Sequence, residues 1–345
     1  MTEAPSVAVV VGAWGRRDFL LAAVRSVLAQ TVPRATVEVV VTKNFDDPAI
    51  DRSLAELGVT VLHDEEPVIG RWLRRAARAT HAPWVLFLDD DDELAPERLA
   101  RFEQVRGEHP DLGFYRCRVR VIDRAGAAVP EARWRLHELD RGLDGIGARY
   151  FPPDGKADLF DVATRRTFAT FNSSSMAIRR DLLDGPLGEA FERTRIPDTF
   201  LFLVGALSPM GVFLDDRRLT RFRFYGASTT SEARWYDWAV TSEDEMADLA
   251  AAHGATDWAT WFRALAVHHG KMLRSATLME RIGAGAGRRE VAGRTREYLR
   301  YLAAHPSERA WNVETWAAGA YGAAYLLAPA AARGLSRARL TGGPG

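Results

Sequence analysis

The sequence has a single cysteine, Cys117, among its 345 residues. One cysteine excludes an internal disulfide and any zinc site built from several cysteines, so we expect a reducing compartment. The sequence also lacks a surplus of either charge, because 46 basic residues balance 46 acidic ones. Nucleic-acid-binding proteins normally carry a basic surplus, so we expect no nucleic-acid partner.

Neither a secretory leader nor a strongly hydrophobic span is evident. No basic and then apolar segment precedes the first predicted strand, so secretion is not expected and we predict a cytoplasmic location. The uncharged stretch 315–332 is rich in Ala and Gly, which makes it weakly hydrophobic for a transmembrane helix. Because Arg333, Arg337 and Arg339 follow, two alternatives stay open: a packed helix, or a peripheral contact of 315–339 with the inner face of a membrane.

The most informative stretch is an apolar run that ends in four carboxylates. Residues 84–88 predict a strand buried on both faces, as in the centre of a parallel sheet, and aspartates occupy positions 89–92 directly after it. Open α/β sheets bind ligands at this end of their strands. Adjacent carboxylates repel one another unless a cation offsets them, and oxygen donors favour Mg²⁺ or Mn²⁺. The alternative is a solvated loop leading into a helix whose first turn contains Pro96 and Glu97.

The surrounding chain predicts an α/β domain. Strands are expected at 7–11, 37–41 and 59–62, and helices at 18–30, 49–57, 70–78 and 96–106. Asp18 is the predicted N-cap of the first helix. Short connections in this order imply a mostly parallel sheet covered by helices on both sides.

The later part of this domain has a weaker pattern. Residues 114–122 alternate apolar side chains with Arg116, Arg118 and Arg120, which predicts a strand with one exposed face. Residues 123–161 predict long loops with room for one hairpin. Asp198 opens a helix predicted at 199–207, and strands near 212–214 and 219–224 close the domain.

From residue 231 onward the sequence predicts helices. Four tryptophans recur at helical spacings, namely Trp235, Trp238, Trp258 and Trp261. His268 and His269 are adjacent, so they cannot both face one metal ion on a helix, and a structural role is favoured. We therefore expect two domains, a catalytic domain at 1–230 and a helical region at 231–345.

The order of these motifs resembles the family 2 inverting glycosyltransferases of the GT-A fold, over most of residues 6–230. The most specific parts are the helix ending at 26–31, Ser-Val-Leu-Ala-Gln-Thr, and the strand ending at 87–92, Phe-Leu-Asp-Asp-Asp-Asp. The resemblance implies a metal-dependent enzyme that moves a sugar from a UDP- or GDP-sugar to a glycan, a small molecule or a lipid-linked acceptor.

The resemblance also assigns roles to individual residues. It places the divalent metal on Asp89 and Asp91 and makes Asp198, which follows Phe191 and Glu192, the general base. The implied donor-binding residues are Gly12, Ala13, Trp14, Lys43, Arg71, Asp89 and Asp90. Arg74 or Arg75 could add charge near the diphosphate, although arginines on a helix are more often solvated. Asn172, Ser173 and Ser174 could bind acceptor or phosphate, or form a polar turn that caps a helix.

The chain departs from the family pattern at several of these positions. Gly-Ala-Trp-Gly-Arg at 12–16 stands where the family usually has Pro-Thr-Tyr-Asn-Arg, and Thr-Lys-Asn-Phe at 42–45 replaces Asp-Asp-Gly-Ser. Pro197 replaces the glutamate before the base, and Tyr225 stands where a histidine is frequent. Two alternatives therefore stay open, a nucleotidyltransferase of related fold and a non-catalytic nucleotide-sugar-binding protein.

Overall fold

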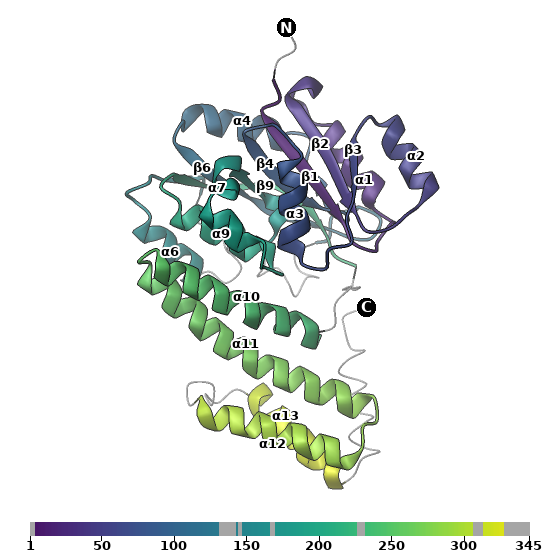
Figure 1. Ribbon diagram of the computed structural model, residues 1–345, viewed down its shortest axis with the longest axis vertical. Coiled ribbons are helices and arrows are strands. Elements are labelled where there is room, and N and C mark those ends of the chain that lie inside the picture. The colour runs from purple at the N-terminus through teal and green to yellow at the C-terminus, as the bar shows by residue number, and fades with distance from the viewer. Residues whose placement is uncertain are drawn as a thin grey trace. The chain divides into compact units, whose positions relative to one another are not determined.

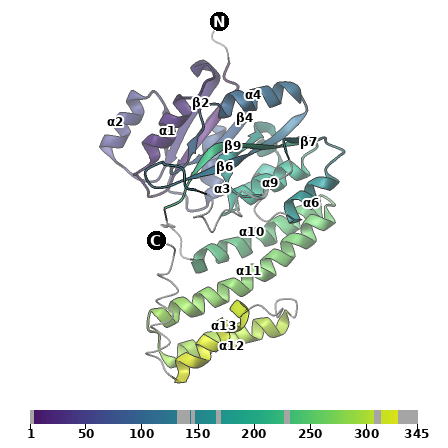
Figure 2. The same cartoon turned by 180° about the vertical axis from the view of Figure 1, so that it is seen from behind.

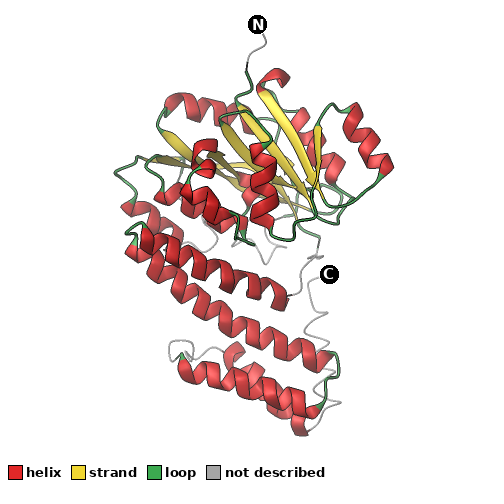
Figure 3. Ribbon diagram, in the orientation of Figure 1, coloured by secondary structure: helices red, strands yellow, loops and turns green. Residues whose placement is uncertain are grey.

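The computed structural model describes residues 4–130, 143, 147–165, 170–225, 232–305 and 313–327. The chain divides into two compact units. Unit 1 comprises Met1–Tyr225 with Ala252–Ala255 and contains the sheet, whereas unit 2 comprises Gly226–Ala251 with Thr256–Gly345 and is helical in its described part (Figures 1 and 3). The division into two domains at residue 230 remains a prediction.

Unit 1 begins with the predicted alternation of strands and helices. Its elements are β1 (Val7–Ala13), α1 (Leu20–Leu28), β2 (Val37–Lys43), α2 (Pro48–Glu56), β3 (Thr60–His63), α3 (Ile69–Arg78) and β4 (Trp84–Asp89). The strands pair in parallel in the order β3-β2-β1-β4. Gly12 of β1 pairs with Thr42 on one side and with Asp89 on the other. The carboxyl ends of three strands therefore meet at one edge.

The second half of unit 1 extends the sheet in a mixed arrangement. Its elements are β5 (Glu93–Leu94), α4 (Arg98–Glu108), β6 (Leu112–Ile122), β7 (Arg149–Phe151), α6 (Ala157–Arg165), β8 (Met176–Arg179), α7 (Arg180–Asp184), α8 (Pro186–Phe191), α9 (Pro197–Leu207) and β9 (Gly211–Arg223). The order continues β4-β8-β6-β9-β5, with β7 on β9. β8 is antiparallel to both β4 and β6, whereas β6 and β9 are parallel. The predicted α/β class is confirmed.

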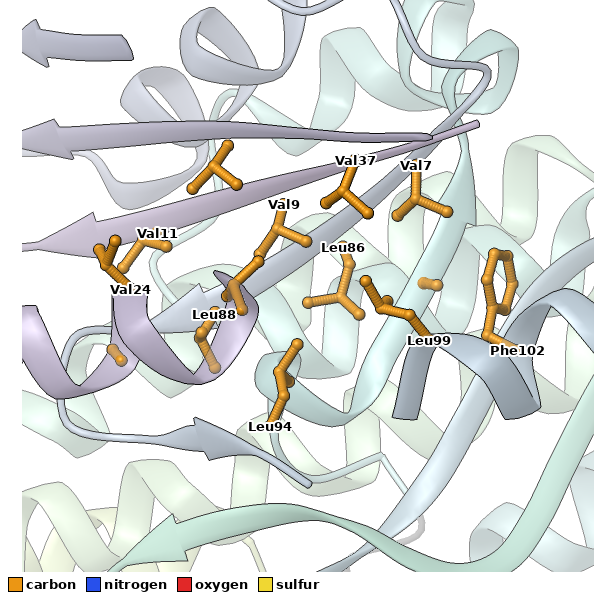
Figure 4. Close-up of a cluster of buried hydrophobic side chains, with 14 of the residues drawn as sticks. Val7, Val9, Val11, Val24, Val37, Leu86, Leu88, Leu94, Leu99 and Phe102 are labelled. Carbon is orange, nitrogen blue, oxygen red and sulfur yellow. The ribbon is translucent and has the colours of Figure 1, made fainter. Parts of the chain in front are cut away.

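The core explains why these strands form. Val7, Val9 and Val11 of β1 lie on the same face as Leu86 and Leu88 of β4, and all five are almost fully buried (Figure 4). Figure 4 also shows Val24 of α1 and Leu99 and Phe102 of α4 packed on this face. On the opposite face the ring of Phe87 lies 5.9 Å from that of Phe191. Burying each such side chain contributes about 1.5–3 kcal/mol, which fixes the strand ends that carry the acids.

Two local predictions about side chains are wrong. Asp18 does not cap α1, because the N-cap is Phe19 without a side-chain hydrogen bond, and Asp18 pairs instead with Arg124 at 2.6 Å. The face of β6 that carries Arg116 is not generally exposed, since α9 and Ser173–Ser175 pack against β6. Arg116 is fully buried and donates to the carbonyl of Phe171, and the arginines become exposed only toward Arg120.

Two segment predictions also need correction. Within the stretch predicted as loops, the structure contains β7 and α6, and the isolated bridge between Ile122 and Ala128 fits the single expected hairpin. Residues 131–142 and 144–146 of the stretch predicted as loops lie outside the described residues. The two strands predicted near 212–214 and 219–224 are one long strand, β9, whose pairing with β6 is irregular around Cys117 and Arg118.

Unit 2 contains α10 (Glu232–Ala252), α11 (Thr256–Gly283), α12 (Arg288–Ala304) and α13 (Val313–Leu327), which confirms the helical prediction. Leu278, Ile282, Val291 and Tyr325 form a cluster that joins the last three helices, which Figure 2 shows from behind. His269 contacts the buried Glu243 at 2.7 Å.

The predicted membrane-contacting stretch at 315–339 lies only in part among the described residues, since α13 ends at Leu327. In the part of the chain that the structure describes, no helix combines the length and the apolar character needed to cross a bilayer.

Candidate active site

The four aspartates at 89–92 form a tight turn, here called the acid loop, at the end of β4. The backbone N–H of Asp90 donates to the carbonyl of Gly12 at 3.1 Å, and that of Asp92 donates to the carbonyl of Asp89 at 3.1 Å. A Cβ at position 12 would lie 2.5 Å from the ring of Trp72, so the close packing of Trp72 requires glycine there. The acid loop is therefore fixed to the end of β1 by backbone hydrogen bonds.

The four carboxylates differ in their surroundings. Asp92 is buried and accepts hydrogen bonds from Nδ2 of Asn172 at 2.9 Å and from the backbone of Arg223 at 3.0 Å. Asp90 is also buried, whereas Asp89 and Asp91 retain some exposure. Asp92 thus holds the loop in place, and Asp89 and Asp91 are the carboxylates that a ligand can reach.

Arg16, in the loop after β1, is the cation of the site. Its guanidinium contacts Asp90 and lies 2.5 Å from Oδ2 of Asp91, and the hydroxyl of Tyr225 donates to the same oxygen at 3.2 Å. No role was predicted for Arg16 from the sequence. The sequence did place Arg16 shortly after β1, and β1 pairs with β4, the strand that ends in the four aspartates.

One arginine does not neutralise this loop. Burial, reinforced by repulsion from Asp91, raises the pKa of Asp89 to about 7, although Arg16 opposes the shift. Burial likewise raises the pKa of Asp90 to about 7 against the opposing effect of Arg16. A group of carboxylates with raised pKa values favours binding of a further cation, because a positive charge restores their ionised forms.

Asp198 is brought to the same edge by Asn172, although 26 residues separate the two. Asn172 precedes the short turn η3 (Ser173–Ser175) and has a φ of 79°, a backbone conformation that is rare outside glycine. Its N–H donates to Oδ2 of Asp198 at 3.4 Å while its side chain donates to Asp92. Asp198 lies in the first turn of α9, and its negative charge contributes to the raised pKa of Asp89.

Ser173 and Ser174 also support the acid loop. The hydroxyl of Ser173 donates to Oδ1 of Asp89 at 3.5 Å, and the hydroxyl of Ser174 accepts from the N–H of Asp89 at 3.0 Å. Two roles were predicted for 172–174, binding of acceptor or phosphate and capping of a helix, and the structure shows neither directly. It shows instead that 172–174 connect β4 to α9.

The part of the chain that carries the acid loop matches a known family. Residues 8–162, somewhat less than half of the chain, match the model described as glycosyl transferase family 2. These residues form a family 2 glycosyltransferase domain. The recognition of this family from the sequence is thereby confirmed. No curated protein sequence matches the chain.

Solved structures share the fold of this chain. The chain resembles S. aureus TarS 1–349 in complex with UDP-GlcNAc, with 14% identity, a TM-score of 0.52 and 83% of each chain covered. It also resembles the mannosyltransferase PcManGT from Pyrobaculum calidifontis in complex with GDP-Man and Mn²⁺, with 16% identity, a TM-score of 0.52, and coverage of 95% of this chain and 88% of that one. Matches to two other TarS structures span only 65% and 39% of those chains. At such identities the likeness shows the fold, which is the predicted GT-A fold.

Among the predicted donor-binding residues of the glycosyltransferase domain, Trp14 is accessible, whereas Ala13 and Lys43 are buried. Trp14 is 38% exposed and stacks on Trp72 with 6.2 Å between ring centroids, so its outer face is open to a planar ligand. Ala13 is buried, which leaves only its backbone available. Lys43 is also buried, and its Nζ already contacts the carbonyl of Phe45 at 2.5 Å and Asp51 at 3.0 Å.

The arginines of α3 point to different partners. Arg71 is exposed and lies 3.5 Å from Glu66, while Arg75 pairs with Asp64 at 2.5 Å. Arg74 is buried and binds Glu192 at 2.5 Å. Arg74 and Glu192 are therefore engaged in joining α3 to the end of α8, whereas Arg71 has the longest ion pair of these three arginines.

The acid loop fits a metal that is shared with a ligand. Among the described residues, no three His, Cys, Asp or Glu side chains surround one point. Mg²⁺ is typically held by one or two carboxylates together with substrate phosphates and water, so Asp89 and Asp91 suffice in number. Oδ1 of Asn172 is buried without a hydrogen-bond partner, as expected for an oxygen that a cation or its bound water would satisfy.

Proposed function

We propose that the chain is a metal-dependent inverting glycosyltransferase that moves a sugar from a nucleotide-diphosphate donor to an acceptor hydroxyl. The observation that carries this proposal is the link through Asn172, which joins Asp198 to the acid loop by two hydrogen bonds. Inversion requires a base on one side of the sugar and a stabilised leaving group on the other. Asp198 and the acid loop would supply these two functions.

The donor is proposed to be a UDP- or GDP-sugar. The similar TarS structure contains UDP-GlcNAc, and the similar mannosyltransferase contains GDP-Man and Mn²⁺. Asp89 and Asp91 would hold Mg²⁺ or Mn²⁺, which would stabilise the charge of the departing diphosphate. The exposed face of Trp14 would stack on the nucleobase, and Gly12 would hold the acid loop in place beside it.

Asp198 would accept the proton of the acceptor hydroxyl at one of its carboxylate oxygens. Burial raises the pKa of Asp198, although backbone hydrogen bonds from Thr199 and Asn172 oppose the shift. A carboxylate with a raised pKa is a stronger base, and the hydrogen bonds fix its direction. The deprotonated hydroxyl oxygen then forms a bond to the anomeric carbon as the bond to the diphosphate breaks.

The two alternative functions, nucleotidyl transfer and donor binding without catalysis, make different predictions. A nucleotidyltransferase would need N–H groups directed at phosphates after β1, but the N–H of Gly15 donates to Oδ1 of Asn44 at 2.7 Å. A non-catalytic protein would bind the donor without consuming it. A glycan or lipid-linked acceptor, a cytoplasmic location and a peripheral membrane contact through 315–339 remain part of the proposal.

The test is incubation with UDP-GlcNAc or GDP-Man and Mn²⁺, with chromatographic analysis of the nucleotides. Slow release of UDP or GDP, abolished by EDTA, is the expected result because glycosyltransferases hydrolyse donors slowly when water replaces the acceptor. Release of a nucleoside monophosphate or consumption of pyrophosphate would favour nucleotidyl transfer. A raised melting temperature with nucleotide and Mn²⁺ but no turnover would favour the binding protein.

A further inference from the structure

Unit 2 contains a hollow that the glycosyltransferase reaction does not use. It lies against α11 and α12, has a volume of about 500 Å³, and is here called the arginine hollow. Its lining residues are Arg274, Gly293, Arg296, Glu297, Arg300 and Tyr301. Arg274 comes from α11 and the other five from α12, so both walls belong to the same unit.

The charges of the arginine hollow are not balanced. Glu297 is its one acid, and it is shared between Arg274 at 3.8 Å and Arg294 at 3.1 Å. Arg296 and Arg300 are exposed, and among the described residues neither has an ion-pair partner. They lie four residues apart on α12, where two like charges repel each other.

One guanidinium of the hollow is fixed in direction. Arg274 lies over the ring of Tyr301, 4.0 Å from its centroid, and donates to the carbonyl of Gly270 at 2.9 Å. Tyr301 is held in turn by a hydrogen bond from its hydroxyl to the carbonyl of Val267 at 2.8 Å. A guanidinium fixed in this way loses little entropy when it binds an anion.

Gly293 keeps the hollow open. It lies in the interior of α12, where glycine destabilises a helix, and a Cβ built there meets no heavy atom within 4 Å. Packing therefore does not require glycine at this position. The missing side chain leaves free space next to the arginines.

A second hollow, in unit 1, provides a contrast. It has a volume of about 280 Å³ and is also lined by arginines, among them Arg221. There Arg221 pairs with Glu93 at 2.8 Å and donates to the carbonyl of Gly126 at 2.8 Å. Arginines that line a hollow in this protein can thus be neutralised internally, and Arg296 and Arg300 are not.

We propose that the arginine hollow binds the phosphate group of an anionic ligand. Guanidinium groups match phosphate oxygens with paired hydrogen bonds, and a bound phosphate would also remove the repulsion between Arg296 and Arg300. The phosphate group belongs either to a water-soluble phosphate compound or to a lipid headgroup. The proposal does not depend on the reaction proposed for unit 1.

The first test measures binding of pyrophosphate by calorimetry and of vesicles by co-sedimentation. The vesicles contain phosphatidylcholine with or without phosphatidylglycerol, and EDTA is present so that no metal bridges a phosphate to the acid loop. The double variant R296Q/R300Q should weaken binding by about tenfold or more, since two charge-assisted contacts are lost. The control R288Q/R289Q removes the same charge from α12 outside the hollow and should bind like the wild type.

Each outcome of this test either identifies the class of ligand or overturns the proposal. Loss of pyrophosphate binding in R296Q/R300Q assigns the hollow to soluble phosphate compounds, and loss of vesicle binding alone assigns it to lipid headgroups. No binding of either probe by the wild type, or equal loss in both double variants, overturns the proposal.

A second variant tests the hollow without changing charge. Gly293→Gln places a side chain in the free space and replaces glycine by a better helix former, so α12 should not be weakened. We expect phosphate binding to fall about tenfold while the melting temperature is retained. Binding equal to that of the wild type would show that the ligand does not occupy the hollow.

Discussion

The acid loop of unit 1 and the arginine hollow of unit 2 both gather charge of one sign, but they are built differently. Asp90 and Asp92 of the acid loop are each only 1% exposed, and Arg16 pairs with the carboxylates of Asp90 and Asp91. Arg296 and Arg300 of the hollow are exposed to solvent. The same kind of charge imbalance is thus buried in one unit and exposed in the other.

The difference determines how strongly each site depends on its ligand. Burial disfavours the charged form of a carboxylate, and together with repulsion from the neighbouring acids it raises the pKa of Asp89 and Asp90 to about 7. Exposed arginines are screened by water and salt. We therefore expect removal of a charge to have a large effect on function at the acid loop, and only a small effect on stability at the hollow when no ligand is bound.

The largest expected effect comes from Asp198→Asn. The amide is nearly isosteric but cannot take the acceptor's proton, so turnover should fall by about 100-fold or more while donor binding is kept. Steady-state kinetics and calorimetry with the donor measure the two quantities. Because burial raises the pKa of Asp198, the wild-type rate should increase with pH through a value above the ordinary aspartate pKa.

Asp184→Asn is the matched control for Asp198→Asn. Asp184 is about half exposed and lies 3.8 Å from Arg78, away from the acid loop, so its variant should turn over normally. If Asp198→Asn turned over at the wild-type rate, the base would have to be another acid of this region. Glu189 would come first, since Asp184 pairs with Arg78 and Glu192 is bound by Arg74.

The next largest effect is expected for Asp91→Ala. Asp91 lies beyond the buried strand and contributes charge rather than packing, so the fold should remain while Mn²⁺-dependent binding of UDP or GDP falls by about tenfold or more. Calorimetric titration measures the affinity, and the melting temperature reports the fold. Asp181→Ala, which removes an exposed acid paired with Arg179, should leave the affinity unchanged. Unchanged affinity in Asp91→Ala would contradict the metal assignment.

Much of unit 1 could be predicted because its strands are continuous apolar runs. The run before Asp89 has the length and composition of a strand buried on both faces, and acids that follow such a strand lie at its carboxyl edge. The helix opened by Asp198 was predicted from local sequence in the same way. These features depend on neighbouring residues, which the sequence shows directly.

The features that were missed depend on the order of the strands. Arg116 alternates with apolar residues, which predicts exposure, yet α9 and η3, which come much later in the chain, pack against its strand, and Arg116 is buried. The roles of Arg16 and Asn172 follow from the pairing of β1 with β4 and of β4 with β8. The helix α6 did leave a local signal, since Leu159 and Ala163 are buried four residues apart, but the surrounding Gly and Pro residues obscured it.

A smaller effect of opposite sign is expected for Arg16→Gln. The variant removes the positive charge that competes with a metal for Asp90 and Asp91, so Mn²⁺ should bind about fivefold more tightly without nucleotide, roughly 1 kcal/mol. Electron paramagnetic resonance of free Mn²⁺ measures this affinity. Arg17→Gln is the control, because Arg17 pairs with Asp47 instead. Weaker or unchanged Mn²⁺ binding in Arg16→Gln would place the metal away from these two carboxylates.

The smallest effect is expected for Arg300→Gln in unit 2. The variant relieves the repulsion between Arg296 and Arg300, so without phosphate it should stabilise α12 by about 0.3 kcal/mol, the usual size for a pair four residues apart on a helix. That gain corresponds to a rise in melting temperature of about 1 °C. The rise should vanish in 1 M salt, where screening acts over about 3 Å. Arg289→Gln lacks this neighbour and should show no such rise. A lower melting temperature of Arg300→Gln in low salt would mean that Arg300 makes a stabilising contact. The arginine hollow would then not contain an unbalanced exposed charge, and its contrast with the acid loop would be wrong.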